Sequence, residues 1–138
     1  MLRRTACARW AAIGAIAGAG ALLAIPAAAD EGFPFGFELT LDAAHQPGSK
    51  RLPTLEIGDN GEALLELWCK GGSGQFSVAG HTVIFIPGAM VDRVCPPERA
   101  QADDELVAAL SEASSWQRQG DLVSFVGPRP LHFRINTN

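Results

Sequence analysis

Two cysteines are the residues of this chain best suited to covalent chemistry. Cys69 lies in the segment Leu67-Trp68-Cys69-Lys70-Gly71-Gly72, and Cys95 lies in Val94-Cys95-Pro96-Pro97. A third cysteine, Cys7, belongs to a segment with the pattern of a secretory signal, and we expect it to be removed with that signal. The exported chain then keeps one pair of thiols in an oxidising compartment, where a disulfide is the expected product. We therefore predict a Cys69–Cys95 bridge between two strand ends that could lie side by side.

Two alternatives stay open for this pair, namely free buried thiols and a metal site shared with a histidine. Cys69, His81 and Cys95 follow the spacing Cys-x11-His-x13-Cys, which matches no compact zinc pattern, and a fourth ligand has no obvious candidate. We therefore expect no metal and no cofactor.

Enzyme chemistry has little support in the residue types. His45, His81 and His132 are scattered over a polar loop, a hairpin tip and a terminal strand. The chain has no Gly-x-Ser-x-Gly turn to hold a nucleophilic serine and no Cys-x-x-Cys redox pair. A small hydrolase or redox enzyme is therefore the disfavoured class, and we expect no catalytic residues.

Two further segments allow a functional interpretation but have a simpler one. Gly71-Gly72-Ser73-Gly74 is similar to a phosphate-binding loop, yet it joins two predicted strands and lacks the lysine and the following helix that such a loop needs. We predict a turn there. Asp103-Asp104-Glu105 could be a catalytic carboxylate cluster, but its place in the first half of a predicted helix favours helix-dipole placement and capping.

The large apolar side chains allow two interpretations. The first is the core of a small domain, formed by Trp68, Phe76, Phe85, Trp116, Phe125 and Phe133. The second is an apolar cleft between sheet and helix that could accept a lipid tail or a peptide of a partner. The candidate cleft residues are Trp68, Phe85, Leu106, Leu110 and Trp116.

The first 29 residues contain the features of a secretory signal in the right order. Three arginines give a basic start, an apolar run extends to Ile25, and Ala27-Ala28-Ala29 offers a small-residue cleavage site. We expect cleavage near Ala29 and a periplasmic or secreted product. An uncleaved membrane anchor is the alternative, because residues 10–29 form an uncharged stretch of 20 residues. Their alanine and glycine content makes them only weakly hydrophobic.

The charge of the mature chain limits the class of its partner. Cleavage after residue 29 leaves 109 of the 138 residues, enough for one domain. The signal contains three of the 11 basic residues and none of the 15 acidic ones, so the mature net charge is −7. Nucleic acid and anionic lipid are disfavoured because both require a basic face. A cationic peptide stays open as a partner; we expect a monomer that contacts the membrane only through an uncleaved signal.

Alternating apolar and polar residues predict antiparallel strands along most of the mature chain. The predicted strands are Phe37–Leu41, Leu55–Ile57, Ala63–Cys69, Gln75–Val78, Thr82–Ile86, Leu122–Val126 and Leu131–Ile135. Gly58-Asp59-Asn60-Gly61 and Ala79-Gly80-His81 provide the turns of two consecutive hairpins. The unbroken run Val83-Ile84-Phe85-Ile86 predicts a strand that is covered on both faces.

After Cys95 the apolar period becomes helical. Apolar residues at helical spacing, with acidic residues toward the start, predict one amphipathic helix over about Glu98–Ser114. The predicted fold class for residues 30–138 is α+β. We expect a curved antiparallel β-sheet, similar to a half-open barrel, with this helix inserted before the last two strands.

Several segments occur in an order that is known from one family. They are Trp68-Cys69-Lys70, Gly74-Gln75-Phe76, the segment ending at Cys95, the helix leucines Leu106 and Leu110, the aromatic Trp116 before Gly120 and Leu122, and Leu131-His132-Phe133. Together they resemble the META domain family, to which the HslJ-like heat-shock proteins belong, over roughly residues 37–133. Trp68 and Lys70 replace the glycine and asparagine that flank the first cysteine in that family.

The resemblance implies a compact envelope protein that is associated with stress tolerance and has no established catalytic activity. We therefore expect a non-enzymatic exported META-type domain that binds a protein or an apolar ligand of the cell envelope. A lipid-binding or assembly-pilot protein of the outer membrane is the alternative. An open cavity between helix and sheet would favour that alternative, and a filled core would count against it.

Overall fold

The computed structural model describes residues 14, 18, 20 and 32–137. Cys7, Ala29 and most of the expected signal segment lie outside the described residues. Within the described part of the chain, no helix has both the length and the apolar character that a membrane span requires.

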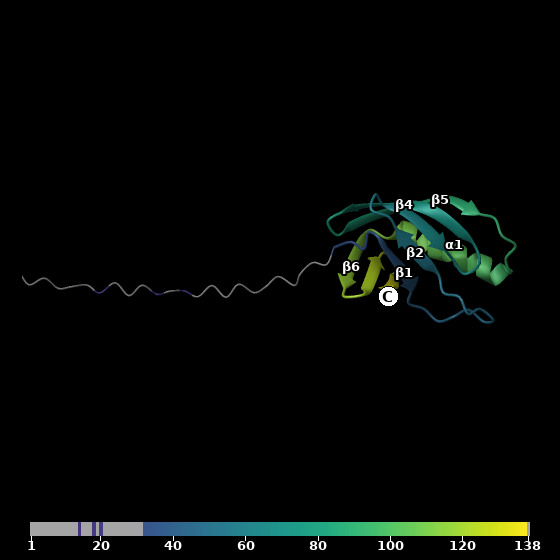
Figure 1. Ribbon diagram of the computed structural model, residues 1–138, viewed down its shortest axis with the longest axis horizontal. Helices are drawn as coiled ribbons and strands as arrows, with labels where there is room; N and C mark the ends of the chain where they lie inside the picture. Colours follow the sequence, from purple (N-terminus) through teal and green to yellow (C-terminus); the bar gives the residue numbers. More distant parts are fainter. Residues whose placement is uncertain (1–13, 15–17, 19, 21–31, 138) are drawn as a thin grey trace, which may run out of the picture.

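Within residues 32–137, eight antiparallel strands form a closed barrel in the order of the sequence (Figure 1). The strands are β1 (Phe37–Leu41), β2 (Thr54–Ile57), β3 (Glu62–Glu66), β4 (Gly71–Ala79), β5 (Thr82–Val91), β6 (Ser115–Gln119), β7 (Leu122–Val126) and β8 (Leu131–Ile135), and the helix is α1 (Pro97–Glu112). Pairing of Leu39 with Ile135 and of Leu41 with Phe133 joins β1 to β8. The predicted fold class is confirmed, and the barrel is closed instead of half-open.

The helix precedes three strands instead of the expected two, because Ser115–Gln119 forms β6. This segment has a single apolar residue, Trp116, so neither alternation nor β-propensity marks it as a strand. Pairing with β7 along its whole length, with Trp116 opposite Phe125, holds it in the sheet. The strand is therefore specified by its neighbours and not by its own sequence.

One apolar core fills the barrel and continues under the helix. Its fully buried members, each at most 1% exposed, include Leu39, Leu55, Ile57, Leu67, Leu110, Val123, Phe125 and Phe133. Phe33 joins this core although it precedes the first strand: its ring centroid lies 5.2 Å from that of Trp116 and 5.8 Å from that of Phe76. The glycine and proline lead-in therefore has no regular structure but is fixed by an aromatic anchor.

The expectation that β5 is covered on both faces is wrong. Val83 and Phe85 point into the core, at 1% and 3% exposure, whereas Ile84 and Ile86 are 55% and 59% exposed on the outer wall. A strand of an antiparallel barrel has one face on the core and one on solvent, so a continuous apolar run leaves every second side chain outside.

The barrel has one weak seam, between β5 and β6. These strands pair only through Thr82 and Ser115, and α1 packs along β5 beyond that point (Figure 1). The seam is held at the hairpin tip, where the Trp116 indole N–H donates to the Gly80 carbonyl at 2.8 Å. The helix thus takes the place that a longer β6 would occupy.

The predicted turn at Gly71-Gly72-Ser73-Gly74 is also wrong, because these residues form the start of β4 and pair with β3 and β5. The chain reverses one step earlier, in the bend at Trp68 and Cys69. The glycines serve close approach: a Cβ at Gly74 would overlap the Phe85 ring, and one at Gly72 would overlap Met90. Glycine in a strand often marks such contact.

Candidate functional site

The two cysteines meet at one end of the barrel. Cys69 lies in the bend before β4, and Cys95 lies between β5 and α1; their Sγ atoms are 2.08 Å apart and their Cα atoms 5.9 Å apart. This is the geometry of a disulfide bond. His81 lies at the tip of the β4–β5 hairpin, at the far end of β4, so the three residues do not form a shared site. Within the described residues, no group of three or more His, Cys, Asp or Glu side chains is placed to hold a metal ion.

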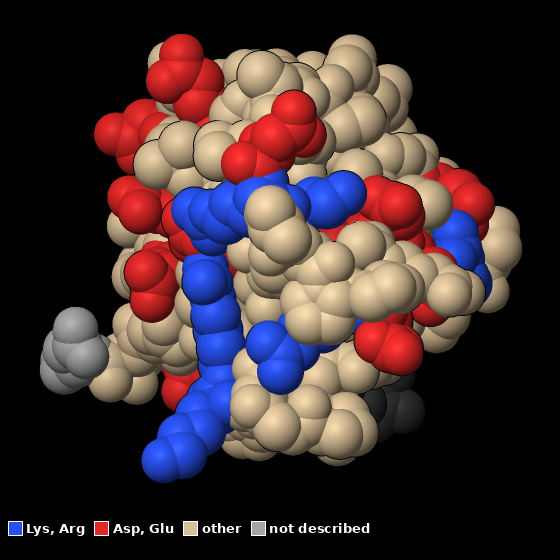
Figure 2. Space-filling model, turned by 90° about the vertical axis from the view of Figure 1, so that its right-hand side faces the viewer, with Lys and Arg blue, Asp and Glu red and all other residues tan. Residues whose placement is uncertain are grey.

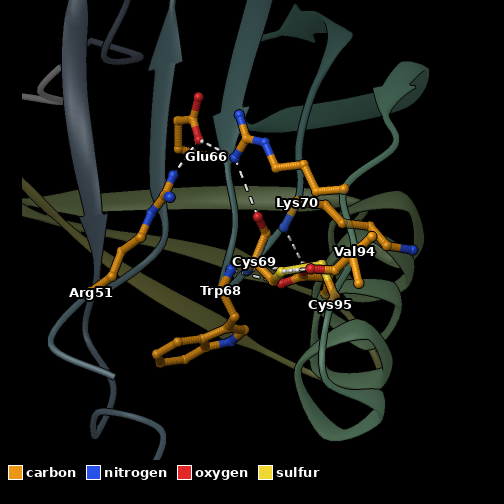
Figure 3. A network of polar contacts seen from close by, with 9 residues as sticks. Arg51, Glu66, Trp68, Cys69, Lys70, Val94 and Cys95 are labelled. Carbon is orange, nitrogen blue, oxygen red and sulfur yellow. Dashed lines mark hydrogen bonds and ion pairs between the residues drawn. A yellow bond between two sulfur atoms is a disulfide. The ribbon is translucent and has the colours of Figure 1, made fainter. Parts of the chain in front are cut away.

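A buried carboxylate supports the bend that holds Cys69 (Figure 3). Asp103 on α1 is only 1% exposed. Its Oδ1 accepts the backbone N–H of Trp68 at 2.6 Å, and its Oδ2 accepts those of Cys69 at 3.1 Å and Lys70 at 2.8 Å. Charge-assisted bonds of this kind are stronger than neutral ones. Asp103 therefore fixes three consecutive amides to the helix.

The acidic residues of α1 do not have the helix-capping role expected of them. Among the described residues, no side chain caps the N-terminus of α1, and Glu98 is the acidic residue of its first turn. Asp103 lies one turn further on and caps the bend of another segment instead. Asp104 and Glu105 are exposed on the helix surface.

A second polar cluster lies beside the bend. Glu66 at the end of β3 forms ion pairs with Arg51 and with Arg93, the latter at 3.3 Å, and Arg93 also donates to the Cys69 carbonyl at 3.2 Å (Figure 3). Desolvation of Glu66 acts to raise its pKa, but the hydrogen bonds and positive charges of Arg51 and Arg93 outweigh it and lower the pKa below 4.5.

The five expected cleft residues are brought together, but within the core. Trp68, Phe85, Leu106, Leu110 and Trp116 are each 6% exposed or less and belong to one cluster of buried side chains. They are part of the filled core, so a ligand could reach them only if the packing around them opened.

The histidines stay apart in the fold, as their sequence positions suggest. His45 is exposed in the loop between β1 and β2, and the His81 ring lies beside that of Trp116, with centroids 5.2 Å apart and the planes tilted by 35°. His132 Nδ1 lies 2.8 Å from Ser124 Oγ on the outer wall. Among the described residues, no carboxylate bonds to His132, so this pair lacks the third member that orients a catalytic base.

A shallow groove of about 530 Å³ lies on the outer wall across β1 to β5. We call it the outer groove; its lining includes Glu38, Glu56, Leu64, Ser73, Ala89 and Val91. Gly71 and Gly72 also line the groove, and the Met90, Arg93 and Glu66 side chains occupy the space above them. Leu64 and Val91 are 61% and 53% exposed, so the groove offers apolar surface to a partner.

Comparison with known proteins identifies the family to which this chain belongs. The model of the META domain family matches residues 37–129, more than half of the chain. The chain belongs to the META domain family. A protein structure solved by NMR has the same fold, with a TM-score of 0.58 over 72% of this chain and 89% of that chain, at 15% sequence identity. No curated protein matches this META domain.

Sequence reasoning missed two features of this META domain that the structure brings together at the cysteine end. Asp103 looked like its exposed neighbours, and only its helical spacing to the apolar residue Leu106 and to Leu110 could have indicated a buried face. The Arg51–Glu66–Arg93 cluster joins three segments that are distant in sequence, so no local pattern marks it.

Proposed function

We propose that this META domain is an exported, non-enzymatic domain that supports the cell envelope under stress by binding a partner protein. Export is supported by the basic start, the apolar run and the small-residue cleavage site. Association with stress tolerance is what the family resemblance implies. The proposed partner is a protein of the envelope.

The observation that carries this proposal is the apolar surface on the outer wall of β3 to β5. Leu64, Ile84, Ile86 and Val91 are each more than half exposed, and Met90 is 37% exposed. Scattered apolar residues on a surface need no explanation, whereas neighbouring ones that share a face are typical of binding sites. Val91 also lines the outer groove, whereas Ile84 and Ile86 lie further back along β5, opposite Ser77 and Gln75 of β4.

The shape of this surface favours a protein over a lipid or another small apolar ligand. Small ligands bind in concave sites that bury most of their surface. Here the five expected cleft residues are buried in the core, and the outer groove is shallow and open. The filled interior therefore counts against the lipid-binding or assembly-pilot alternative, and an open wall suits a partner that brings its own surface.

The test is site-specific photo-crosslinking in living cells of the source organism under envelope stress. A crosslinking residue at Ile84 or Ile86 should give a discrete adduct with one envelope protein, whereas one at Gln117 or Gln119 on β6 should not. A folded Ile84→Ser, Ile86→Ser variant should lose both the adduct formed from Leu64 and the stress protection. Full protection by that variant would overturn the proposal.

A further inference from the structure

We infer that the outer groove recognises an extended segment of the partner protein in which a lysine or arginine and an apolar residue alternate with small residues. The cation would lie between Glu38 and Glu56, and the apolar side chain would lie against Leu64. This inference rests on the proposed function and names the chemistry of the partner.

The first step is an acidic pair without a cation. Glu38 on β1 stands directly opposite Glu56 on β2, and both side chains point outward. Among the described residues, neither carboxylate forms an ion pair; Glu38 accepts a hydrogen bond from the Asn136 amide, which carries no charge. Like charges directly opposite each other in a sheet are destabilising. A cation that binds here would relieve that repulsion.

Glu66, a third acidic residue of the outer groove, is paired with cations of the chain, unlike Glu38 and Glu56. Glu66 lines the same groove and holds two arginines, Arg51 and Arg93. Figure 2 shows a stripe of Lys and Arg side chains across this face, with Asp and Glu side chains at the left edge and further ones beside the stripe and on the right. Elsewhere Arg129 pairs with Glu112 and Arg134 with Asp42, whereas among the described residues Glu38 and Glu56 have no ion-pair partner and can take a cation from outside.

The second step is the apolar surface beside the acidic pair. Leu64 on β3 stands opposite Glu56 and is 61% exposed. The next strand offers Ser73 opposite Leu64, followed by Ala89 and Val91 on the groove lining. Moving across the strands, the wall therefore changes from acidic to apolar within one strand spacing, about 5 Å.

The third step is the match with an extended peptide. Side chains at alternate positions of an extended chain point to the same face, about 7 Å apart. A peptide that crosses the strands can therefore place a cation over Glu38 and Glu56 and the second residue along over Leu64. Glu56 is exposed and Leu64 is 61% exposed, so a peptide backbone can lie above them. The mature net charge of −7 adds a general attraction for a cationic segment.

The test uses the mature protein and a synthetic peptide with the repeat Lys-Ser-Val-Ser. Binding is followed at low ionic strength by two-dimensional NMR of the labelled protein. We expect saturable shifts of the amides of β1 to β3, and weak or no shifts with peptides in which glutamate replaces lysine or serine replaces valine. The Glu38→Gln, Glu56→Gln variant should bind up to about tenfold more weakly, because two exposed charge contacts are lost.

The matched control removes the same charge elsewhere. Asp104→Asn with Glu105→Gln on α1 should leave binding unchanged, since both residues are exposed on the helix. Equal weakening by the control would mean general electrostatic attraction and would overturn the inference, as would equal binding of the glutamate peptide. If the peptide fails to bind while Ile84 still crosslinks to a partner, the inference falls and the proposed function stands.

Discussion

At the scale of single residues, the end of the barrel that holds the cysteines is organised by side chains from several segments. Asp103 from the helix satisfies the amides of the bend, the Cys69–Cys95 pair joins that bend to the segment before the helix, and Arg93 contacts the Cys69 carbonyl. Backbone N–H groups in a buried bend must find acceptors, and here the two oxygens of one carboxylate accept three of them.

Replacing Asp103 by asparagine should destabilise the protein by about 1–3 kcal/mol. The amide keeps one acceptor oxygen and turns its own N–H₂ group toward backbone donors that then lose their partner. Urea unfolding of the purified domain measures the change. Asp104→Asn, on the exposed side of the same helix, is the matched control and should stay within about 0.5 kcal/mol of the wild type. Equal stability of the two variants would refute the role assigned to Asp103.

Cys69 and Cys95 should be oxidised in protein purified from the envelope. Intact mass under non-reducing conditions should be lower by two hydrogens than after reduction, and neither thiol should react with an alkylating agent. The Cys95→Ala variant should lose about 2–5 kcal/mol of stability, because the unfolded chain is no longer constrained. Two alkylated thiols in freshly isolated protein would contradict the bridge.

Glu66 should contribute a small stability that depends on pH. Since its pKa is lowered in the folded state, the contribution is fully present above its ordinary value of 4.5 and is lost as the pH falls through the lower folded value. The ion pairs are partly exposed, so Glu66→Gln should cost less than about 1 kcal/mol at neutral pH. Unfolding free energies of both proteins should converge in acid. A difference that stays constant with pH would show that charge is not its cause.

At the scale of elements, β4 and β5 form the part of the barrel that differs most from expectation. The four residues Gly71 to Gly74 are strand, and their glycines allow the two strands to pack against bulky side chains. The outer residues of β5 remain exposed and supply the proposed binding surface. The same hairpin therefore combines close packing inside with apolar exposure outside.

Gly74→Ala tests the close approach directly. The new methyl group would overlap the Phe85 ring, so Phe85 must move and the free energy of unfolding should fall by about 1–3 kcal/mol. Gly32→Ala, where nothing lies within 4 Å of the added atom, serves as the comparison and should have little effect. Chemical denaturation of both variants measures their free energies of unfolding. An unchanged value for Gly74→Ala would mean that there is space for a methyl group between Gly74 and the Phe85 ring.

The sequence predicts elements well where their pattern is local and poorly where neighbours decide. The helix over Pro97–Glu112 lies within two residues of the range expected from its spacing, and the turn residue Gly61 has the positive φ (85°) that an Asn-Gly turn suggests. The polar strand β6 was missed, since only Trp116 marks it. The exposed face of β5 could not be foreseen either, because an apolar run does not tell which side faces water.

At the scale of the whole molecule, one small barrel with a filled core is joined to an N-terminal segment that has the features of an export signal. A chain of this size has a modest core, so we expect the predicted Cys69–Cys95 bridge at one end and the helix along the weak seam to matter for its stability. The proposed recognition of a partner therefore falls to the surface and not to the filled interior.

Export predicts a defined N-terminus. Protein isolated from the envelope or the medium should begin at Asp30, because the small-residue site ends at Ala29. N-terminal sequencing or intact mass measures this. An Ala27→Leu, Ala29→Leu variant should be processed poorly, whereas Ala28→Leu should be processed normally. The reason is that the peptidase recognises small residues at the first and third positions before the cleaved bond. Recovery of residues 1–29 on the exported wild type would contradict the prediction.

If the chain is exported and cleaved after Ala29, as proposed, the aromatic anchor at Phe33 has a consequence for the order of events. Its ring packs against Trp116, Phe76 and Phe125, while the Gly32 carbonyl accepts a hydrogen bond from Arg118 at 3.1 Å. With a cleavage site after Ala29, only three residues separate the scissile bond from this anchor. A peptidase active site needs an extended chain on both sides of the bond it cuts. Under the proposed export, we therefore expect processing to precede the docking of Phe33, so that removal of the signal would permit the barrel to finish folding.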